Sequence, residues 1–185
     1  MQKSAFTTIE LLLVIVIIGV MAAMTIPRII RKSPDSSWEH VTFEVNNLAH
    51  FARQESIAKQ KMHRLAFISG LRGKELLRVE IETDDPEKPD RLLFKPTTSE
   101  YFTPRYELPK HIYLNAVYKG KEDKLDGKTV KRASCHFIPH GLVEEVTIHL
   151  SRQEENGTDS KTSIHMAPFL GTFSMQEGHV KPDKK

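Results

Sequence analysis

The chain has 185 residues, of which 39% are hydrophobic and 28% are charged. This length suits one globular core with an appended segment and leaves too little chain for two large domains. Its formal net charge of +3, from 27 Lys and Arg against 24 Asp and Glu, does not by itself indicate a nucleic-acid partner. The single cysteine, Cys135, excludes an internal disulfide framework, and we expect a packed thiol in a strand.

The first predicted element is an apolar helix over residues 6–26. Between Leu11 and Ile26, only Gly19 and Thr25 interrupt the strongly apolar run. At 1.5 Å per residue this helix would reach about 30 Å, the thickness of the hydrocarbon core of a bilayer. We therefore expect a transmembrane helix within residues 6–32.

Glu10 stands directly before the apolar run. A carboxylate near lipid is costly and usually has a partner. A secretory signal peptide would use Lys3 as its basic start and a cleavage site near Val20, Met21 and Ala22. An ordinary membrane anchor would need only the apolar run. Neither alternative has a use for Glu10.

The stretch from Ser4 to Pro27 resembles the class III signal of type IV pilins and type II secretion pseudopilins. The resemblance implies a leader at residues 1–5, cut by a prepilin peptidase between Ala5 and Phe6. It implies N-methylation of the new Phe6 terminus and a helix-loosening role for Pro27. Ala5 departs from the family pattern, in which the leader usually ends in Gly.

After that cleavage Glu10 is the fifth residue of the mature chain, where the family has its characteristic glutamate. We expect it to pair with the Phe6 amine of a neighbouring subunit when the helices bundle, because a buried charge needs a partner. Such a pair would also set the axial register. The alternative is that Glu10 only extends toward lipid headgroups.

The resemblance implies a single-pass protein of the inner membrane, with its globular domain in the periplasm. The basic residues Arg28, Arg31 and Lys32 follow the apolar run, and the positive-inside rule would place that domain in the cytoplasm. The family resemblance favours the periplasmic orientation.

A second helix is predicted over residues 38–61. The segment Ser33-Pro34-Asp35-Ser36 interrupts the first helix and carries the caps of the next. The apolar positions recur at helical spacing, and polar residues such as Asn46 and Arg53 occupy other directions. We expect this apolar stripe to pack on a sheet, although it would also suit a partner-binding face; its residues are Val41, Val45, Leu48 and Ala52.

The remainder predicts short strands. Leu77, Val79 and Ile81 alternate with charged residues, as in a half-buried strand. The clearest hairpin pairs residues 146–150 with residues 162–166, and Phe173 and Met175 follow in a last strand. Further strands are expected at residues 65–69, 91–95, 111–118, 133–138 and 143–150.

These elements predict an α+β, pilin-like fold. A long N-terminal helix would pack by its C-terminal half on one antiparallel β-sheet. The globular domain would occupy residues 33–176, followed by a charged tail at residues 177–185.

The C-terminal half resembles a second, weaker pattern, that of general secretion pathway protein H and fimbrial protein T. In those families Phe-x-Pro-x-Gly precedes a β-hairpin, and Pro-x-x-Gly precedes a last strand. The corresponding residues are Phe137, Pro139 and Gly141, then Pro168 and Gly171. The resemblance implies a minor pseudopilin of the type II secretion system, assembled at the filament tip with other pseudopilins. It also implies prepilin peptidase and the inner-membrane assembly platform as partners.

The residues do not predict an enzyme, a metal site or a cofactor. Glu144 and Glu145 are adjacent and would point to opposite faces of a strand. Asp84, Asp85 and Asp90 offer oxygen ligands for calcium, but we expect a solvated loop. None of the zinc spacings occurs among the residues of the sheet region that could ligate a metal, which are Cys135, His136, His140, His149 and His165.

The most basic stretch suggests an alternative function, a type IV pilus minor pilin that binds DNA for uptake. Acidic residues dilute this stretch, and no aromatic side chains interleave with it, so a solvated surface loop is favoured. The basic residues are Lys119, Lys121, Lys124, Lys128, Lys131 and Arg132, with Lys181, Lys184 and Lys185 in the tail.

Overall fold

The structure is a computed structural model that describes residues 8–30, 36–71, 74–85, 92–125, 130–153 and 159–180. The chain divides into two compact units, Met1–Ser37 and Trp38–Lys185. The predicted leader, the cleavage site and the methylated Phe6 lie outside the described residues.

The first unit contains helix α1 (Thr8–Ile30), with Glu10 in its first turn. From Ile9 to Met21, every large apolar side chain of α1 is 47% to 77% exposed. These side chains are therefore not packed into a hydrophobic core.

The predicted membrane span is wrong. Among the described residues, no helix is both long enough and apolar enough to cross a membrane. A span needs about 20 consecutive apolar residues. The apolar run of the sequence starts only at Leu11, after Glu10, and ends at Ile26, before Pro27, which is short of that length. The single-pass inner-membrane location that depended on this span is contradicted with it.

Helix α2 (Ser36–Lys59) confirms the second predicted helix to within two residues at each end. Its predicted stripe is buried, with Val41, Val45, Leu48 and Ala52 no more than 1% exposed. The helix ends where Gln60 adopts a left-handed backbone conformation at φ 50°.

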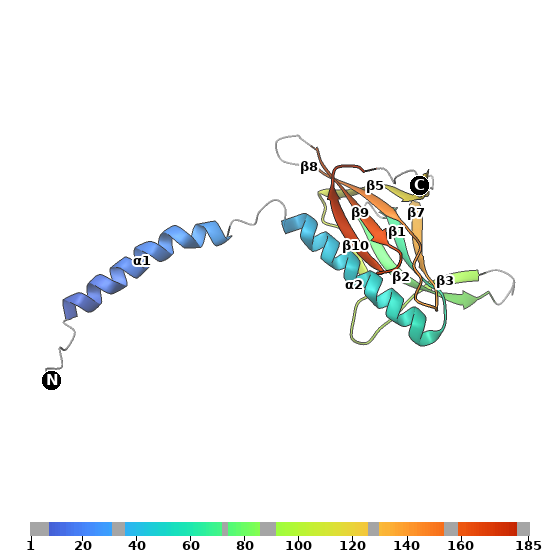
Figure 1. Ribbon diagram of the computed structural model, residues 1–185, viewed down its shortest axis with the longest axis horizontal. Coiled ribbons are helices and arrows are strands. Elements are labelled where there is room, and N and C mark those ends of the chain that lie inside the picture. The colour runs from blue at the N-terminus through green and yellow to red at the C-terminus, as the bar shows by residue number, and fades with distance from the viewer. Residues whose placement is uncertain are drawn as a thin grey trace. The chain divides into compact units, whose positions relative to one another are not determined.

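The strands form two antiparallel sheets (Figure 1). The first sheet has the order β3-β2-β1-β7, with β4 paired to β2; the second has the order β10-β9-β8-β5-β6. The first sheet contains β1 (His63–Leu71), β2 (Lys74–Asp84), β3 (Leu92–Pro96), β4 (Arg105–Glu107) and β7 (Lys131–Phe137). The second contains β5 (Ile112–Lys119), β6 (Glu122–Asp123), β8 (Thr147–Gln153), β9 (Asp159–Ala167) and β10 (Thr172–Glu177).

The predicted hairpin is confirmed in β8 and β9. Ile148 lies opposite Ile164, and Leu150 lies opposite Thr162. The predicted strand at residues 143–150 is shorter than expected, because Val143 makes only an isolated bridge to Phe137 and β8 begins at Thr147. The two shortest strands, β4 and β6, were not predicted.

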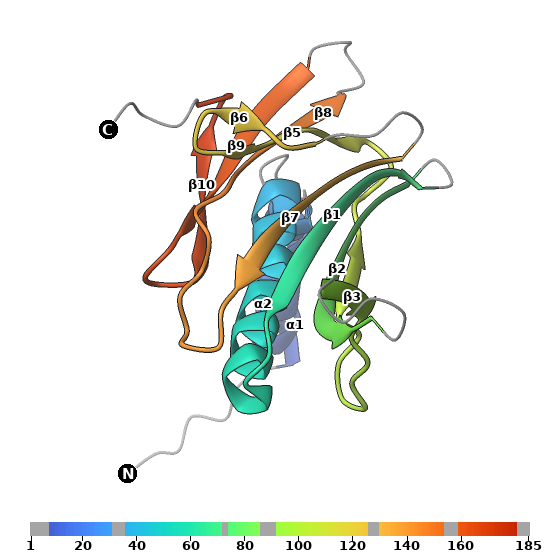
Figure 2. The same ribbon diagram turned by 90° about the vertical axis from the view of Figure 1, so that its right-hand side faces the viewer.

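Helix α2 shares one buried core with both sheets, and Figure 2 shows it lying alongside them. Leu65 and Phe67 of β1 are fully buried in this core, as are Ile164 and Met166 of β9. The apolar stripe of α2 thus packs between two sets of inward-pointing side chains.

The predicted fold class is therefore wrong. The described chain is mostly β-sheet with two separate helices, and it has two antiparallel sheets instead of one sheet under a single long helix. The local elements were predicted from their periodicity, but the division of the strands between two sheets depends on pairings between distant segments. β1, for example, pairs with both β2 and β7.

Candidate functional site

The residues predicted to act in assembly lie in or before α1. Glu10 occupies the first turn of α1, and Pro27 lies within the helix, which continues to Ile30. Ala5 and Phe6 lie outside the described residues. The processing and pairing roles of these residues stay predictions.

The first turn of the weaker family pattern follows β7. Phe137 ends the strand and is fully buried. The Ile138 N–H donates to the Leu142 carbonyl at 2.9 Å, and the Gly141 N–H donates to the Ile138 carbonyl at 2.9 Å. Gly141 has φ 81°, a left-handed conformation that favours glycine. The chain therefore reverses tightly around Pro139.

The second turn of the pattern joins β9 to β10. The Gly171 N–H donates to the Ala167 carbonyl at 2.8 Å, with Gly171 at φ 66°. A Cβ atom at Gly171 would lie 2.9 Å from Cδ of Arg53. Both the backbone conformation and the close approach of Arg53 therefore call for glycine here.

Arg53 of α2 joins the two turns. Its Nε donates to the Gly141 carbonyl at 3.2 Å, and its Nη1 donates to the Leu170 carbonyl at 2.9 Å. The planar guanidinium suits this double role because its N–H groups diverge in fixed directions. The structure thus brings together two turns that are far apart in the sequence. The residue that joins them, Arg53, was predicted only to lie on a polar face of its helix.

The two turns present apolar side chains to solvent. We call Ile138, Leu142, Phe169 and Leu170 the apolar patch; their side chains are 38%, 51%, 84% and 67% exposed. A hollow of about 660 Å³ lies beside it. The hollow is lined by Met62, His136, Ile138, Leu142, Val143, Glu144, Pro168 and Phe169. Contiguous exposed apolar surface of this kind often marks an interaction site.

One charged cluster borders the hollow. The Glu144 carboxylate lies 2.8 Å from Nδ1 of His136 and accepts a hydrogen bond from Nζ of Lys119 at 2.8 Å. Partial burial would raise the pKa of Glu144, but the hydrogen bonds from His136 and Lys119 outweigh it and lower that pKa to about 2. The charged side chains at the edge of the hollow therefore already pair with one another.

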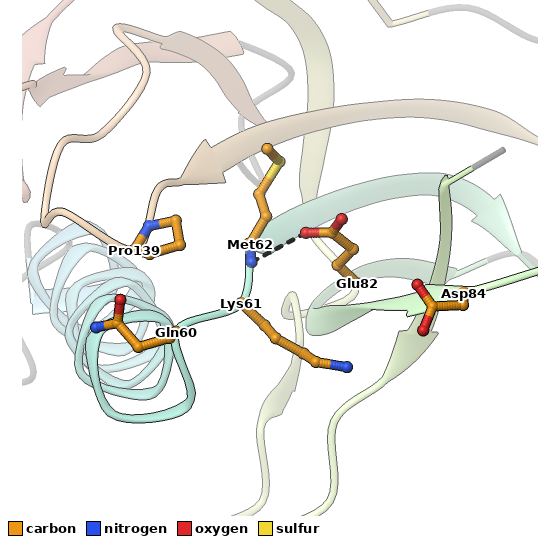
Figure 3. A pocket seen from close by; sticks show the side chains of 6 residues that line it. All are labelled: Gln60, Lys61, Met62, Glu82, Asp84 and Pro139. Carbon is orange, nitrogen blue, oxygen red and sulfur yellow. Dashed lines mark hydrogen bonds between the residues drawn. The ribbon is translucent and has the colours of Figure 1, made fainter. Parts of the chain in front are cut away.

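A second, smaller hollow of about 340 Å³ lies at the end of α2 (Figure 3). Glu82 and Asp84 contribute its carboxylates. The Glu82 carboxylate accepts a hydrogen bond from the Met62 N–H at 3.1 Å, which a dashed line marks in Figure 3. Of the acids considered for calcium, Asp90 lies outside the described residues. In the part of the chain that is described, no group of three or more His, Cys, Asp or Glu residues is placed to hold a metal.

Cys135 is fully buried in β7, which confirms the prediction of a packed thiol. Burial, together with the nearby Glu144 carboxylate, raises the pKa of the Cys135 thiol. The thiol contacts the Glu144 carbonyl at 3.4 Å.

Two lysines of the basic stretch considered for DNA binding form ion pairs with acidic residues of the same chain. Lys119 pairs with Glu144, and Lys124 pairs with Glu122. Lys128 and the tail lysines lie outside the described residues.

Comparison with known proteins found no matching family model, no matching curated protein and no matching solved structure.

Proposed function

We propose that the chain is a minor pseudopilin of the type II secretion system that assembles with other subunits through α1. One observation carries the proposal. Helix α1 places an acid in its first turn and leaves the large apolar side chains from Ile9 to Met21 exposed, while the apolar stripe of α2 is buried in the core that it shares with the two sheets.

The proposal follows from the chemistry of α1. An apolar helix without a core gains free energy when neighbouring helices cover it. Its first-turn acid would then enter an apolar environment, where a carboxylate needs a cation. The Phe6 amine created by cleavage after Ala5 would supply that cation from the neighbouring subunit. Processing by a prepilin peptidase and N-methylation of Phe6 belong to the same proposal.

The partners in this proposal are other pseudopilins and the assembly platform of the secretion system. The resemblance of Ser4 to Pro27 to the class III signal supports this choice. The two glycine-bearing turns that Arg53 joins also support it, since they carry the residues of the weaker pattern.

A Glu10→Ala variant tests the proposal. We expect it to be cleaved normally, as shown by intact mass and N-terminal sequence, but to enter filaments more than about tenfold less than the parent, because removing one partner of a buried ion pair is strongly destabilising. Filament entry would be measured by immunoblot of the sheared filament fraction. Glu39→Ala is the matched control, since Glu39 occupies the first turn of α2. Equal incorporation of the Glu10→Ala variant would contradict the proposal, as would a mature chain that does not begin at Phe6.

A further inference from the structure

The C-terminal half of β10 is an open sheet edge. β10 ends the second sheet (Figure 2), and its residues alternate between backbone groups that face β9 and backbone groups that face outward. Phe173 belongs to the outward set, because Asn46 of α2 bonds both of its backbone groups. Met175 and Glu177 belong to the same set, since they follow at intervals of two residues. Among the described residues, none bonds the outward N–H and C=O groups of Met175 and Glu177.

This edge lacks the usual protection against pairing with another strand. Natural edge strands are commonly short or carry Lys or Pro. The edge strand β3 of the first sheet has Lys95 and Pro96, and β6, at the opposite edge of the second sheet, is 2 residues long. β10 has 6 residues without Lys or Pro, and every residue from Ser174 to Glu177 is exposed. Its open half can therefore accept another strand.

We propose that this edge pairs with the same edge of a second copy of the chain, antiparallel, with Gln176 opposite its own counterpart. This contact lies outside the proposed function, because α1 takes no part in it. Both copies use the same surface, as in any two-fold interface. Met175 of each copy then lies opposite Glu177 of the other, and the two residues exchange both backbone hydrogen bonds. Every open backbone group of Met175 and Glu177 thereby gains a partner.

Asn46 and the charge of Glu177 select this register. Outward residues of one strand can bond only outward residues of the other. Centring the pair on Met175 or on an earlier residue would use Phe173, whose backbone groups already bond Asn46. Centring it on Glu177 would place two carboxylates directly opposite each other, which is destabilising. The register centred on Gln176 avoids both conflicts.

The chain leaves the sheet edge where β10 ends. At Gly178, φ is 77° and the N–H donates to the Lys161 carbonyl of β9 at 2.9 Å. Nε2 of His179 lies 3.1 Å from the Leu150 carbonyl of β8, so the chain turns across the sheet. In the proposed register, the position beyond Gly178 faces Phe173 of the other copy, which α2 bonds there. Because the chain has left the edge, it does not compete with that helix.

The same constraints favour a second copy over a strand from another protein. A longer foreign strand would extend past Met175 and meet the Phe173 groups, which Asn46 already bonds. Two copies also bring their Gln176 side chains together, because opposite residues of such a pair have Cβ atoms about 5 Å apart. Each amide has both donors and an acceptor, so the two identical side chains can bond each other.

Disulfide formation in the full-length chain tests the inference. Gln176→Cys places two thiols at opposite positions whose Cα atoms would be about 4.5 Å apart, which permits a disulfide. Ser174→Cys is the matched control, because Ser174 is exposed on the same face of β10 but would lie about 14 Å from its counterpart. Under mild oxidation we expect the Gln176→Cys chain to form the symmetric dimer at least about tenfold faster than the Ser174→Cys chain. Peptide mass spectrometry identifies the bond and separates it from any link to Cys135.

A proline variant separates backbone pairing from chance contact. Met175→Pro removes an outward N–H but no bond to β9, and edge strands tolerate proline at such positions. In the Gln176→Cys chain it should slow formation of the 176–176 disulfide by about tenfold or more. Met175→Ala keeps the N–H and should leave the rate within about twofold of the Gln176→Cys chain.

Equal rates for the Gln176→Cys and Ser174→Cys chains would overturn the inference. A 176–176 disulfide that forms as fast with Met175→Pro as with Met175→Ala would also overturn it. Because α1 takes no part, adding Glu10→Ala should leave this disulfide unchanged. The disulfide test can therefore fail while the proposed function stands, and the filament test of Glu10→Ala can fail while this inference stands.

Discussion

Asn46 of α2 bonds both backbone groups of Phe173 in β10. Its Nδ2 donates to the Phe173 carbonyl at 2.9 Å, and its Oδ1 accepts the Phe173 N–H at 2.6 Å. β10 is an edge strand of the second sheet, so these groups would otherwise lack a ladder partner. The side-chain amide thus takes the place of a neighbouring strand and ties the sheet edge to the helix.

We expect Asn46→Ala to lower the free energy of unfolding by about 1 to 3 kcal/mol relative to Asn47→Ala, because it leaves a nearly buried N–H and carbonyl unpaired. Asn47 is the matched control, since the same substitution on the same helix makes the same change in helix propensity. Urea unfolding measures both. Equal stabilities would show that water replaces the amide at no cost.

Gly171→Ala tests the contact between the β9–β10 turn and Arg53. Gly171 and Gly120 have similar φ values, 66° and 59°, but only at Gly171 would a new Cβ meet Arg53, at 2.9 Å from Cδ. Both substitutions should cost about 1 to 2 kcal/mol for the left-handed backbone. Gly171→Ala should cost about 1 kcal/mol more, because Arg53 must move away from the carbonyls that it binds.

Thermal or urea unfolding compares the stabilities of Gly171→Ala and Gly120→Ala with that of the parent. In an Arg53→Ala background the extra cost at Gly171 should disappear, since nothing then crowds the new methyl group. If Gly171→Ala still costs more than Gly120→Ala in the Arg53→Ala background, the extra loss of stability does not come from contact with Arg53.

The pH dependence of stability should report the Glu144 cluster. The pKa of Glu144 is lowered from its ordinary value of 4.5 to about 2, so the folded state binds the proton more weakly than the unfolded state. The stabilisation is therefore complete above pH 4.5 and is lost as the pH falls toward 2. Glu144→Gln should be less stable than the parent above pH 4.5, and the difference should narrow toward pH 2.

Glu145→Gln is the control for this titration, because Glu145 is adjacent and its side chain is 61% exposed. Its stability relative to the parent should change little over the same range. A Glu144→Gln difference that stays constant with pH would mean that the charge of the carboxylate does not matter.

The sequence predicted the parts of the fold that depend on local pattern. The stripe from Val41 to Ala52 defined α2, and the alternation around Ile148 and Ile164 defined a hairpin whose two arms are close in the chain. The division into two sheets was missed, because the partner of a strand such as β1 is β7, whose residues follow more than sixty positions later. Nothing in the local pattern of either strand specifies that partner.

The sequence predicted only part of the candidate site, again the part that depends on local pattern. Gly141 and Gly171 stood out as turn residues, but their meeting point was not predicted, because it requires Arg53 to reach two carbonyls from a third segment. Exposed Phe169 and Leu170 beside Gly171 were the available signal, since large apolar side chains are uncommon at a tight turn. The predicted membrane span failed for a different reason. It was inferred from the composition of the apolar run, whereas no described helix is both long and apolar enough.

The thiol of Cys135 should react only when the chain opens. The side chain is fully buried, and burial raises its pKa, so both access and the reactive thiolate are suppressed in the folded state. We expect iodoacetamide to label Cys135 at a rate set by unfolding, and rapidly in concentrated urea. A cysteine introduced by Phe169→Cys is the matched control, because that turn position is 84% exposed and should label at once in native buffer. If Cys135 instead labelled natively as fast as position 169, β7 would have to open far more often than its place in the shared core permits.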